Sequence, residues 1–227
     1  MKYNGFYYAL FKGQMKKTIA EHFDKKYASE IMKKSKKVYK KIVKEAPDIG
    51  DDNPMAYNAL FALAFFSPYI ASEKKISPEI VTEMMKRSLY HIKWFFSRTD
   101  VNTPKGKMGN KKDILKYYKW YTKEKEEKYP TSFKIDFVGQ PYDGACYYRI
   151  TRCPICSYAK TLGVSELMPL FCELDAVMIH LQHGILKREC TIAKGDEYCD
   201  YFIVGDKEDE RKTNSWSIYY SFREIQY

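Results

Sequence analysis

The hydrophobic periodicity of this chain changes near residue 130, and this change constrains the fold more than any other feature of the sequence. Before it, apolar residues such as Ile19, Phe23 and Tyr27 recur at helical spacing. After it, residues 132–139 and 146–152 alternate apolar and polar side chains, as strands do. Helices followed by strands predict an α+β fold, in which a helical N-terminal half precedes a C-terminal antiparallel sheet with packed helices.

Prolines, glycines and capping residues divide the sequence into its expected elements. The expected helices cover residues 14–46, 54–71, 78–98, 111–128 and 164–184, and residues 99–110 are expected to form a loop. Strands are expected at 132–139, at 146–152 and as a pair within 185–207 around a turn at 194–197. The chain therefore divides into a helical region, residues 1–130, and an α+β region, residues 131–227, which one continuous domain could also contain.

The net charge of +10 is unevenly placed along the chain. Residues 1–129 contain 28 Lys and Arg against 15 Asp and Glu, whereas residues 130–227 contain 11 against 14. Lysines predominate over arginines in the basic helices, and no nucleic-acid-binding motif is present. We therefore interpret the excess lysines as solvent-exposed helix faces and expect no nucleic-acid partner.

The apolar segments are too short for a membrane protein. The longest run, residues 59–71, cannot cross a bilayer and is interrupted by Ser67-Pro68. The N-terminus lacks a clear signal-peptide core and cleavage site. We expect no membrane partner and a cytoplasmic location, where the six cysteines would be reduced thiols rather than disulfides.

Cys153 and Cys156 form a Cys-Pro-x-Cys motif that has three interpretations. A zinc site needs a second ligand pair, but the other cysteines are isolated in the sequence. A thiol oxidoreductase is the second interpretation, because the motif resembles that of glutaredoxins, although the Thr-Val-Pro segment of that family is absent. We favour the third, in which Cys156 packs as a small apolar residue and Cys153 belongs to a site formed with later residues.

The expected helix at 164–184 carries polar residues on an otherwise apolar stripe. At about 100° per residue, Cys172, Asp175, Ile179 and His183 fall within a stripe about 80° wide. A carboxylate on a core-facing stripe is costly to bury without a partner, and such a stripe is typical of a pocket wall. His183 lies about 16 Å from Cys172 along the helix axis, too far for a direct nucleophile–base pair.

The expected pair of strands within 185–207 places further side chains by its register. A turn centred on residues 195–196 pairs Cys190 with Tyr201 and leaves Cys190 about 7–8 Å from Cys199, beyond the usual span of a disulfide. One face of this pair would carry Arg188, Cys190, Cys199 and Tyr201, and the other Thr191 and Asp200.

Residues 191–200 read Thr-x-Ala-x-Gly-Asp-x-x-Cys-Asp, which resembles the C-terminal motif of the L-2-amino-thiazoline-4-carboxylic acid hydrolase family. The segments RITRCPI (149–155) and FCELDAVM (171–178) resemble the same family, so that the resemblance covers residues 130–205. A similar Gly-Asp-x-x-Cys hairpin occurs in 4-vinyl-reductase-like domains, which are ligand-binding modules.

The resemblance implies a hydrolase that opens a five-membered cyclic isothiourea, such as L-2-amino-thiazoline-4-carboxylate, to a carbamoyl-cysteine. The chemistry needs either a thiolate that attacks the amidine carbon or a carboxylate that activates water. The implied catalytic residues are Cys153, Cys172, Asp175 and Cys199. The expected substrate-binding residues are Arg188, which suits a carboxylate, and His183, Thr191 and Asp200.

Two other functions stay open at this point. The first alternative is a non-catalytic small-molecule-binding or sensing domain related to 4-vinyl-reductase-like modules, and the second is a thiol oxidoreductase that uses Cys153 and Cys156. In each case the expected partner is a small molecule. No cofactor is expected and no metal ligand is assigned, while a divalent metal and a homo-oligomer are left as open alternatives.

Overall fold

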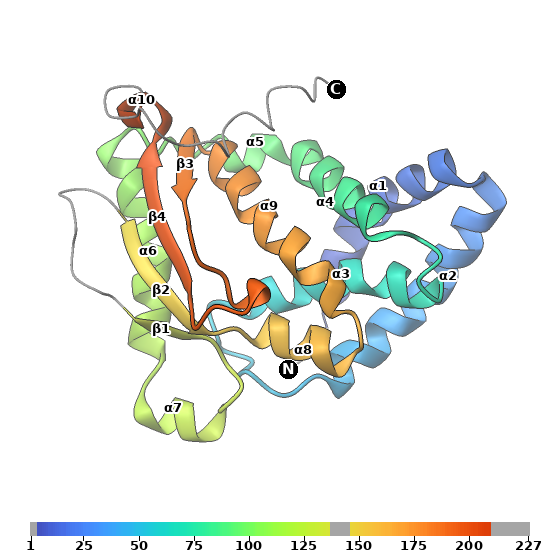
Figure 1. Cartoon of the computed structure of the whole chain (residues 1–227), viewed down its shortest axis with the longest axis horizontal. Coiled ribbons are helices and arrows are strands. Elements are labelled where there is room, and N and C mark those ends of the chain that lie inside the picture. The colour runs from blue at the N-terminus through green and yellow to red at the C-terminus, as the bar shows by residue number, and fades with distance from the viewer. Residues whose placement is uncertain (1–3, 137–145, 210–227) are drawn as a thin grey trace.

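The computed structural model describes residues 4–136 and 146–209 of the 227-residue chain. The second half of the expected strand at 132–139 and the tail from residue 210 onward lie outside the described residues. Within the described residues, a group of helices adjoins a four-stranded sheet (Figure 1). This arrangement confirms the predicted α+β fold.

Four helices form the N-terminal part of the molecule. They are α1 (Phe6–His22), α2 (Lys25–Glu45), α3 (Ala56–Ala71) and α4 (Pro78–His91). The single helix expected at 14–46 is wrong, because the chain breaks at Phe23 and restarts at Asp24. The Asp24 side chain accepts a hydrogen bond from the Tyr27 amide at 2.7 Å and so caps α2. The apolar pattern continues across this break and conceals it.

Three further helices begin or end at residues other than those expected. They are α5 (Lys93–Phe96), α6 (Pro104–Trp120) and α7 (Lys123–Lys128). The loop expected at 99–110 is therefore wrong in part, because Thr103 caps α6 by accepting the Gly106 amide at 3.1 Å. Gly106 suggested a loop, but it serves close packing, since a Cβ there would lie 1.9 Å from the Asp100 carbonyl oxygen. Thr122 similarly caps α7 and divides the helix expected at 111–128.

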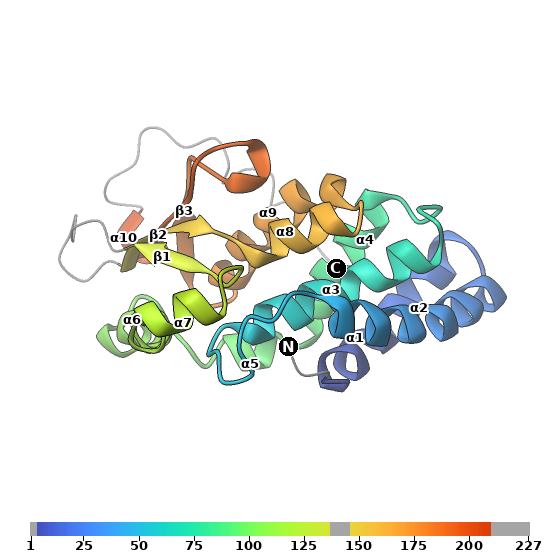
Figure 2. The same ribbon diagram turned by 90° about the horizontal axis from the view of Figure 1, so that it is seen from below.

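The sheet is antiparallel, with the strand order β1-β2-β4-β3. Its strands are β1 (Lys134–Asp136), β2 (Cys146–Arg152), β3 (Gly184–Lys187) and β4 (Cys199–Gly205). In the central pair, Tyr148 lies opposite Tyr201 and Ile150 lies opposite Cys199. These residues share the more buried face of the sheet, with which Tyr117 of α6 clusters. Figure 2 shows α6 and α7 together on one side of the sheet.

Helices α8 (Pro154–Thr161) and α9 (Met168–His180) connect the sheet to the N-terminal helices. In Figure 1, α9 runs beside β3 and toward α3 and α4. The Phe171 ring of α9 lies 4.8 Å from the Phe66 ring of α3, measured between centroids, and the Tyr158 hydroxyl of α8 donates to the Pro47 carbonyl at 2.9 Å. A short 3-10 helix (Ser165–Leu167) precedes α9, and α10 (Asp206–Asp209) follows β4. One hydrophobic core therefore contains side chains from both sides of residue 130.

The expected register of the β3–β4 pair is wrong by two residues. The structure places Lys187 opposite Phe202, and β3 ends there. The connection, residues 188–198, contains a short 3-10 helix (Ile192–Lys194) followed by Gly195 in the left-handed conformation at φ 99°. The expected pairing of Cys190 with Tyr201 therefore does not occur.

None of the helices within residues 4–136 and 146–209 combines the length and the apolar character needed to span a bilayer.

Candidate functional site

Asp175 of α9 is the centre of the candidate site. Its Oδ2 atom accepts a hydrogen bond from Nη1 of Arg188 at 2.8 Å and another from the Tyr201 hydroxyl at 2.7 Å. Arg188 immediately follows β3, and Tyr201 lies in β4. The structure thus brings one helix and two neighbouring strands together at a single carboxylate oxygen.

Arg188 is the most buried charged group of this site. Its side chain is 10% exposed, whereas that of Asp175 is 26% exposed. The second guanidinium nitrogen donates to the Cys172 carbonyl, and the guanidinium lies 5.3 Å from the centre of the Tyr201 ring. Burial, the largest single influence, lowers the pKa of Arg188, but the charge and hydrogen bond of Asp175 together with the nearby Tyr201 and Cys172 make the net pKa shift upward. The charged guanidinium therefore depends on an anion beside it.

Tyr201 is held as a protonated hydrogen-bond donor. Burial, followed by the negative charge of Asp175, raises the pKa of its hydroxyl well above the usual value. Its ring stacks on that of Tyr148 with a centroid distance of 4.8 Å and an angle of 8° between the planes. Tyr148 is itself buried, so the stack fixes the direction in which the Tyr201 hydroxyl points.

Three cysteines complete the cluster, and their thiols are protonated near neutral pH. Burial and then the charge of Asp175 raise the pKa of Cys172. Burial likewise raises the pKa of Cys199 to about 11, although its sulfur accepts the Ile192 amide at 3.2 Å. The nearby Cys153 also contributes, through its charge, to the raised pKa of both Cys172 and Cys199. We call the resulting group the Asp175 cluster; it contains Cys153, Cys172, Asp175, Arg188, Cys199 and Tyr201.

Cys153 lies at the N-terminus of α8, the position that the redox interpretation requires. Its pKa is raised, first by a hydrogen bond with the Cys156 thiol, then by burial and by the charge of Cys156. Amide hydrogen bonds from the first turn of α8 act in the opposite direction but are outweighed. A reactive redox thiol has a lowered pKa, and neither the burial of Cys153 nor its hydrogen bond with Cys156 acts in that direction.

The residues that the structure describes contain no group of three or more His, Cys, Asp or Glu side chains placed to hold a metal ion. This finding concerns residues 4–136 and 146–209. The zinc interpretation of the Cys-Pro-x-Cys motif therefore has no support from the described geometry.

His183 is not part of the Asp175 cluster, and its expected place on the Asp175 stripe is wrong. Helix α9 ends at His180, and His183 has a positive φ of 57°, so the helical spacing does not extend to it. Its exposed ring instead lies 3.8 Å from the Asp206 carboxylate. The helical spacing of the sequence continues to Gly184, so it does not indicate that α9 ends earlier, at His180.

The other expected binding residues support the connection between β3 and β4. The Asp200 carboxylate accepts the amides of Glu189 and Cys190, the closest contact being 2.7 Å. The Thr191 amide donates to Asp196 at 2.7 Å, and the buried Thr191 hydroxyl has no hydrogen-bond partner among the described residues. Asp200 therefore holds the segment that carries Arg188.

Cys190 lies apart from the face on which it was expected. Its thiol is hydrogen-bonded to the Tyr198 hydroxyl, whereas Cys199 contacts the Ile192 amide. Both thiols are free, in agreement with the prediction that they do not form a disulfide. The strand alternation that placed Cys190 beside Cys199 ends with β3 at Lys187.

Sequence reasoning missed Tyr201 and Tyr148 as members of the site. Tyr201 was expected on the same face as Arg188, and this shared face is the signal that could have identified it as a partner of Asp175. Tyr148 had no comparable signal, because its contact with Tyr201 depends on the β2–β4 register.

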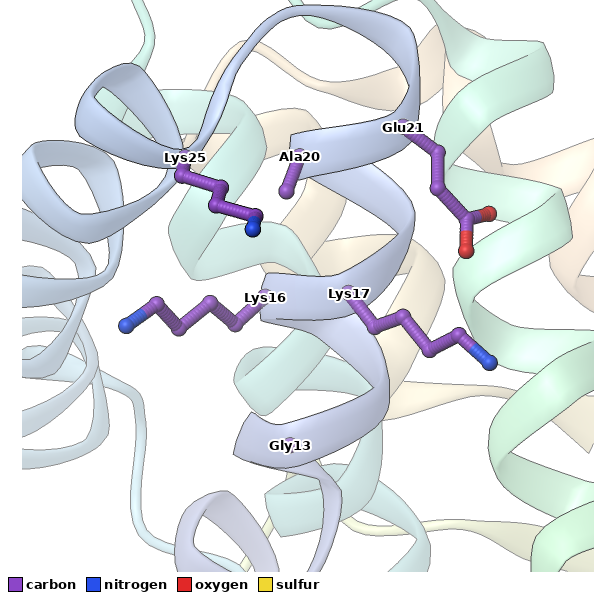
Figure 3. A pocket seen from close by; sticks show the side chains of 6 residues that line it. All are labelled: Gly13, Lys16, Lys17, Ala20, Glu21 and Lys25. Carbon is purple, nitrogen blue, oxygen red and sulfur yellow. The ribbon is translucent and has the colours of Figure 1, made fainter.

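A surface depression lies elsewhere, on α1 and the start of α2 (Figure 3). It is lined by Gly13, Lys16, Lys17, Ala20, Glu21 and Lys25. The Lys16 and Lys17 side chains point in opposite directions, and Glu21 is paired with Arg87. Since its polar groups do not converge, this depression is not a candidate catalytic site.

A family model described as L-2-amino-thiazoline-4-carboxylic acid hydrolase matches residues 57–203. The matched range begins in α3, ends in β4 and contains every residue of the Asp175 cluster. No curated protein and no solved structure matches the chain.

Proposed function

Because this chain belongs to the L-2-amino-thiazoline-4-carboxylic acid hydrolase family, we propose that it hydrolyses the ring of a cyclic isothiourea such as L-2-amino-thiazoline-4-carboxylate. The observation that carries the proposal is the position of Asp175, between two fixed donors and near the buried thiols of Cys172 and Cys199, within the matched residues. The product would be a carbamoyl-cysteine.

The proposed reaction uses Asp175 as a general base. Asp175 takes a proton from water as the water oxygen attacks the amidine carbon. Asp175 passes this proton to the ring nitrogen. The tetrahedral intermediate then loses its carbon–sulfur bond as its hydroxyl becomes the new carbonyl, and the proton of that hydroxyl goes to the sulfur, which leaves as a thiol. One water molecule is consumed and the ring opens, so that atoms and charges balance without a redox partner.

The protonation states favour a carboxylate base over a thiolate nucleophile. Cys153, Cys172 and Cys199 all have raised pKa values, so their thiols are poor nucleophiles near pH 7. Asp175 is more exposed than Arg188, so the carboxylate lies on the accessible side of the ion pair. We assign the thiols to shaping the site around the substrate ring.

An assay with purified protein and L-2-amino-thiazoline-4-carboxylate tests this function. We expect the wild type to form ring-opened product and D175N to lower kcat by roughly 100-fold or more while keeping the fold. E166Q is the matched control, because it removes the carboxylate of another ion pair, with Lys74 at 2.7 Å, outside the cluster. A near-normal rate for D175N would assign Asp175 a structural role.

The proposed reaction needs only the substrate and water, so no cofactor is part of the proposal. This point is tested by assaying the protein before and after treatment with a chelator followed by gel filtration. An activity that chelation removes and added divalent metal restores would require a metal in the mechanism. We further propose a reducing, cytoplasmic location, which suits a protein whose described cysteines in the cluster are free thiols.

A binding or sensing module is the second candidate function. One observation favours it. Asp175 is held in an ion pair with Arg188, and the neighbouring thiols of Cys172 and Cys199 are protonated. Absence of turnover together with tight binding of a small carboxylate would support this candidate over the hydrolase.

A further inference from the structure

We propose that Arg188 is the recognition residue for a substrate carboxylate and that Asp175 occupies this position in the resting protein. A substrate carboxylate would replace Asp175 at Arg188 and thereby free Asp175 to act as the base. This inference rests on the proposed function and adds to it a means by which binding of the substrate carboxylate releases the base.

The hydrogen bonds of Arg188 with described residues leave donors of its guanidinium unused, which permits such an exchange. Asp175 uses a single guanidinium nitrogen, Nη1, whereas an arginine can hold a carboxylate with two parallel hydrogen bonds. The other terminal nitrogen is directed at the Cys172 carbonyl, a backbone group that holds the guanidinium in place when Asp175 leaves. An incoming carboxylate would therefore meet a cation that is already positioned.

The burial of Arg188 makes an anion necessary at this position. A guanidinium that is only 10% exposed is poorly hydrated, and leaving it without a negative partner is costly. Asp175 meets this need in the resting protein. A ligand carboxylate would meet it equally well, so the guanidinium keeps a negative partner when the ligand carboxylate takes the place of Asp175.

Tyr201 would retain Asp175 after the exchange. Its hydroxyl donates to the same Oδ2 atom as Arg188, and its ring is fixed by the stack on Tyr148. Oδ1 of Asp175 accepts no hydrogen bond from the described residues. Once Arg188 pairs with the ligand, Asp175 is released from its cationic partner, while Tyr201 keeps it oriented.

The exchange links recognition to catalysis. A ring without a carboxylate would leave Asp175 paired with Arg188, and so would lower kcat as well as affinity. Selectivity for carboxylate-bearing rings then arises from the internal ion pair and does not require a second basic residue.

Binding measurements with a ring that cannot be opened in the same way test this inference. The probe is thiazolidine-4-carboxylate, which lacks the amidine carbon, and its control is thiazolidine, which also lacks the carboxylate. By calorimetry we expect D175N to bind the probe about 10- to 100-fold more tightly than the wild type, because the competing internal carboxylate is gone. E166Q should bind like the wild type, and thiazolidine should gain nothing from D175N.

Unchanged or weaker binding of the probe by folded D175N would overturn the inference. If D175N does not fold, a crystal structure of the wild type with the probe decides the matter. The inference requires the probe carboxylate on Arg188 with Asp175 bonded to Tyr201, and an intact Arg188–Asp175 pair with the probe bound elsewhere would contradict it.

These outcomes separate the inference from the proposed function, because neither measurement depends on turnover. Tighter probe binding by D175N without any ring opening by the wild type would contradict the hydrolase proposal alone. Ring opening by the wild type without a gain in affinity in D175N would contradict the exchange alone.

Discussion

At the scale of single residues, Cys153 and Cys156 occupy the same end of α8 but pack in different surroundings. Cys153 packs with the cluster of buried residues around the sheet, whereas Cys156 packs with the larger core of the helices. Their thiols share a hydrogen bond, and this bond is the first cause of the raised pKa of Cys153. The two positions should therefore respond differently to the same substitution.

We predict that C153S lowers turnover with little change in Tm, because it alters a group of the Asp175 cluster while keeping a similar volume. C156S should keep its activity but lose roughly 1–3 kcal/mol of stability if the hydroxyl lacks a partner in the apolar core. Steady-state kinetics and thermal unfolding of the two variants measure these effects. Equal losses at both positions would instead indicate a redox or metal pair.

The protonated state of Cys199 predicts a dependence of stability on pH. The folded-state pKa of about 11 exceeds the unfolded value of about 8.5, so the folded protein keeps this proton where the unfolded chain loses it. This contribution is complete below about pH 8.5 and is lost as the pH rises toward about 11. We expect C199A to remove roughly 2–3 kcal/mol of the alkaline decrease in the free energy of unfolding.

Urea unfolding of the wild type and C199A at several pH values between about 7.5 and 11 measures this difference. The two proteins are compared by the slope of the free energy of unfolding against pH, because Cys172 and Tyr201 also have raised pKa values and contribute to both curves. Parallel curves for the two proteins would show that Cys199 is not buried in its thiol form.

At the scale of elements, the connection between β3 and β4 positions Arg188. Asp200 at the start of β4 accepts the amides of Glu189 and Cys190 and so closes the connection near its first residue. Asp196 accepts the Thr191 amide farther along the same segment. The two aspartates therefore hold different parts of one connection, and Asp200 is the one that bonds the residue next to Arg188 in sequence.

We predict that D200A acts on catalysis through Arg188. It should speed hydrogen exchange at the Glu189 and Cys190 amides and lower kcat/KM by about tenfold, because a misplaced guanidinium weakens the site. D196A is the matched variant and should speed exchange at Thr191 with a smaller kinetic effect. A rise in KM for D200A without faster amide exchange would favour direct contact between Asp200 and the substrate.

At the scale of the whole molecule, α8 and α9 pack into the N-terminal helices although they follow β2 in sequence. The Phe66–Phe171 contact joins α3 to α9, and the hydroxyl of Tyr69 in α3 donates to Glu166 at 2.8 Å. The helix that carries Asp175 is thus supported by residues from the first half of the chain. The stability of the site and that of the helical core should be coupled.

We predict that F171A destabilises the protein by about 3 kcal/mol in a single cooperative transition, because it opens a cavity between α9 and α3. F95A is the control, since Phe95 is 58% exposed and its loss should change stability by less than about 0.5 kcal/mol. Denaturant unfolding followed by circular dichroism and by tryptophan fluorescence provides the measurement. Two separated transitions would show that the halves fold independently.

The sequence by itself determined the elements whose signals are local. Alternation predicted β2, and a largely apolar segment after a proline-containing break predicted α3. Helical spacing placed Cys172 and Asp175 on one helix, and the segments around Cys153 and Cys199 pointed to the family that matches residues 57–203. Helix ends were harder to predict. Asp24 and Thr103 cap helices in the structure, but the apolar pattern runs across the first, and glycines near the second favoured a loop.

Only the tertiary structure decided which groups meet Asp175. Arg188 and Tyr201 are 13 and 26 residues away in sequence, and their meeting depends on where β3 ends and how residues 188–198 turn. The protonation states of the thiols were equally hidden, since burial depends on α9, the sheet and the N-terminal helices together. Periodicity records which face of an element is apolar, whereas register and burial are set by contacts between distant segments.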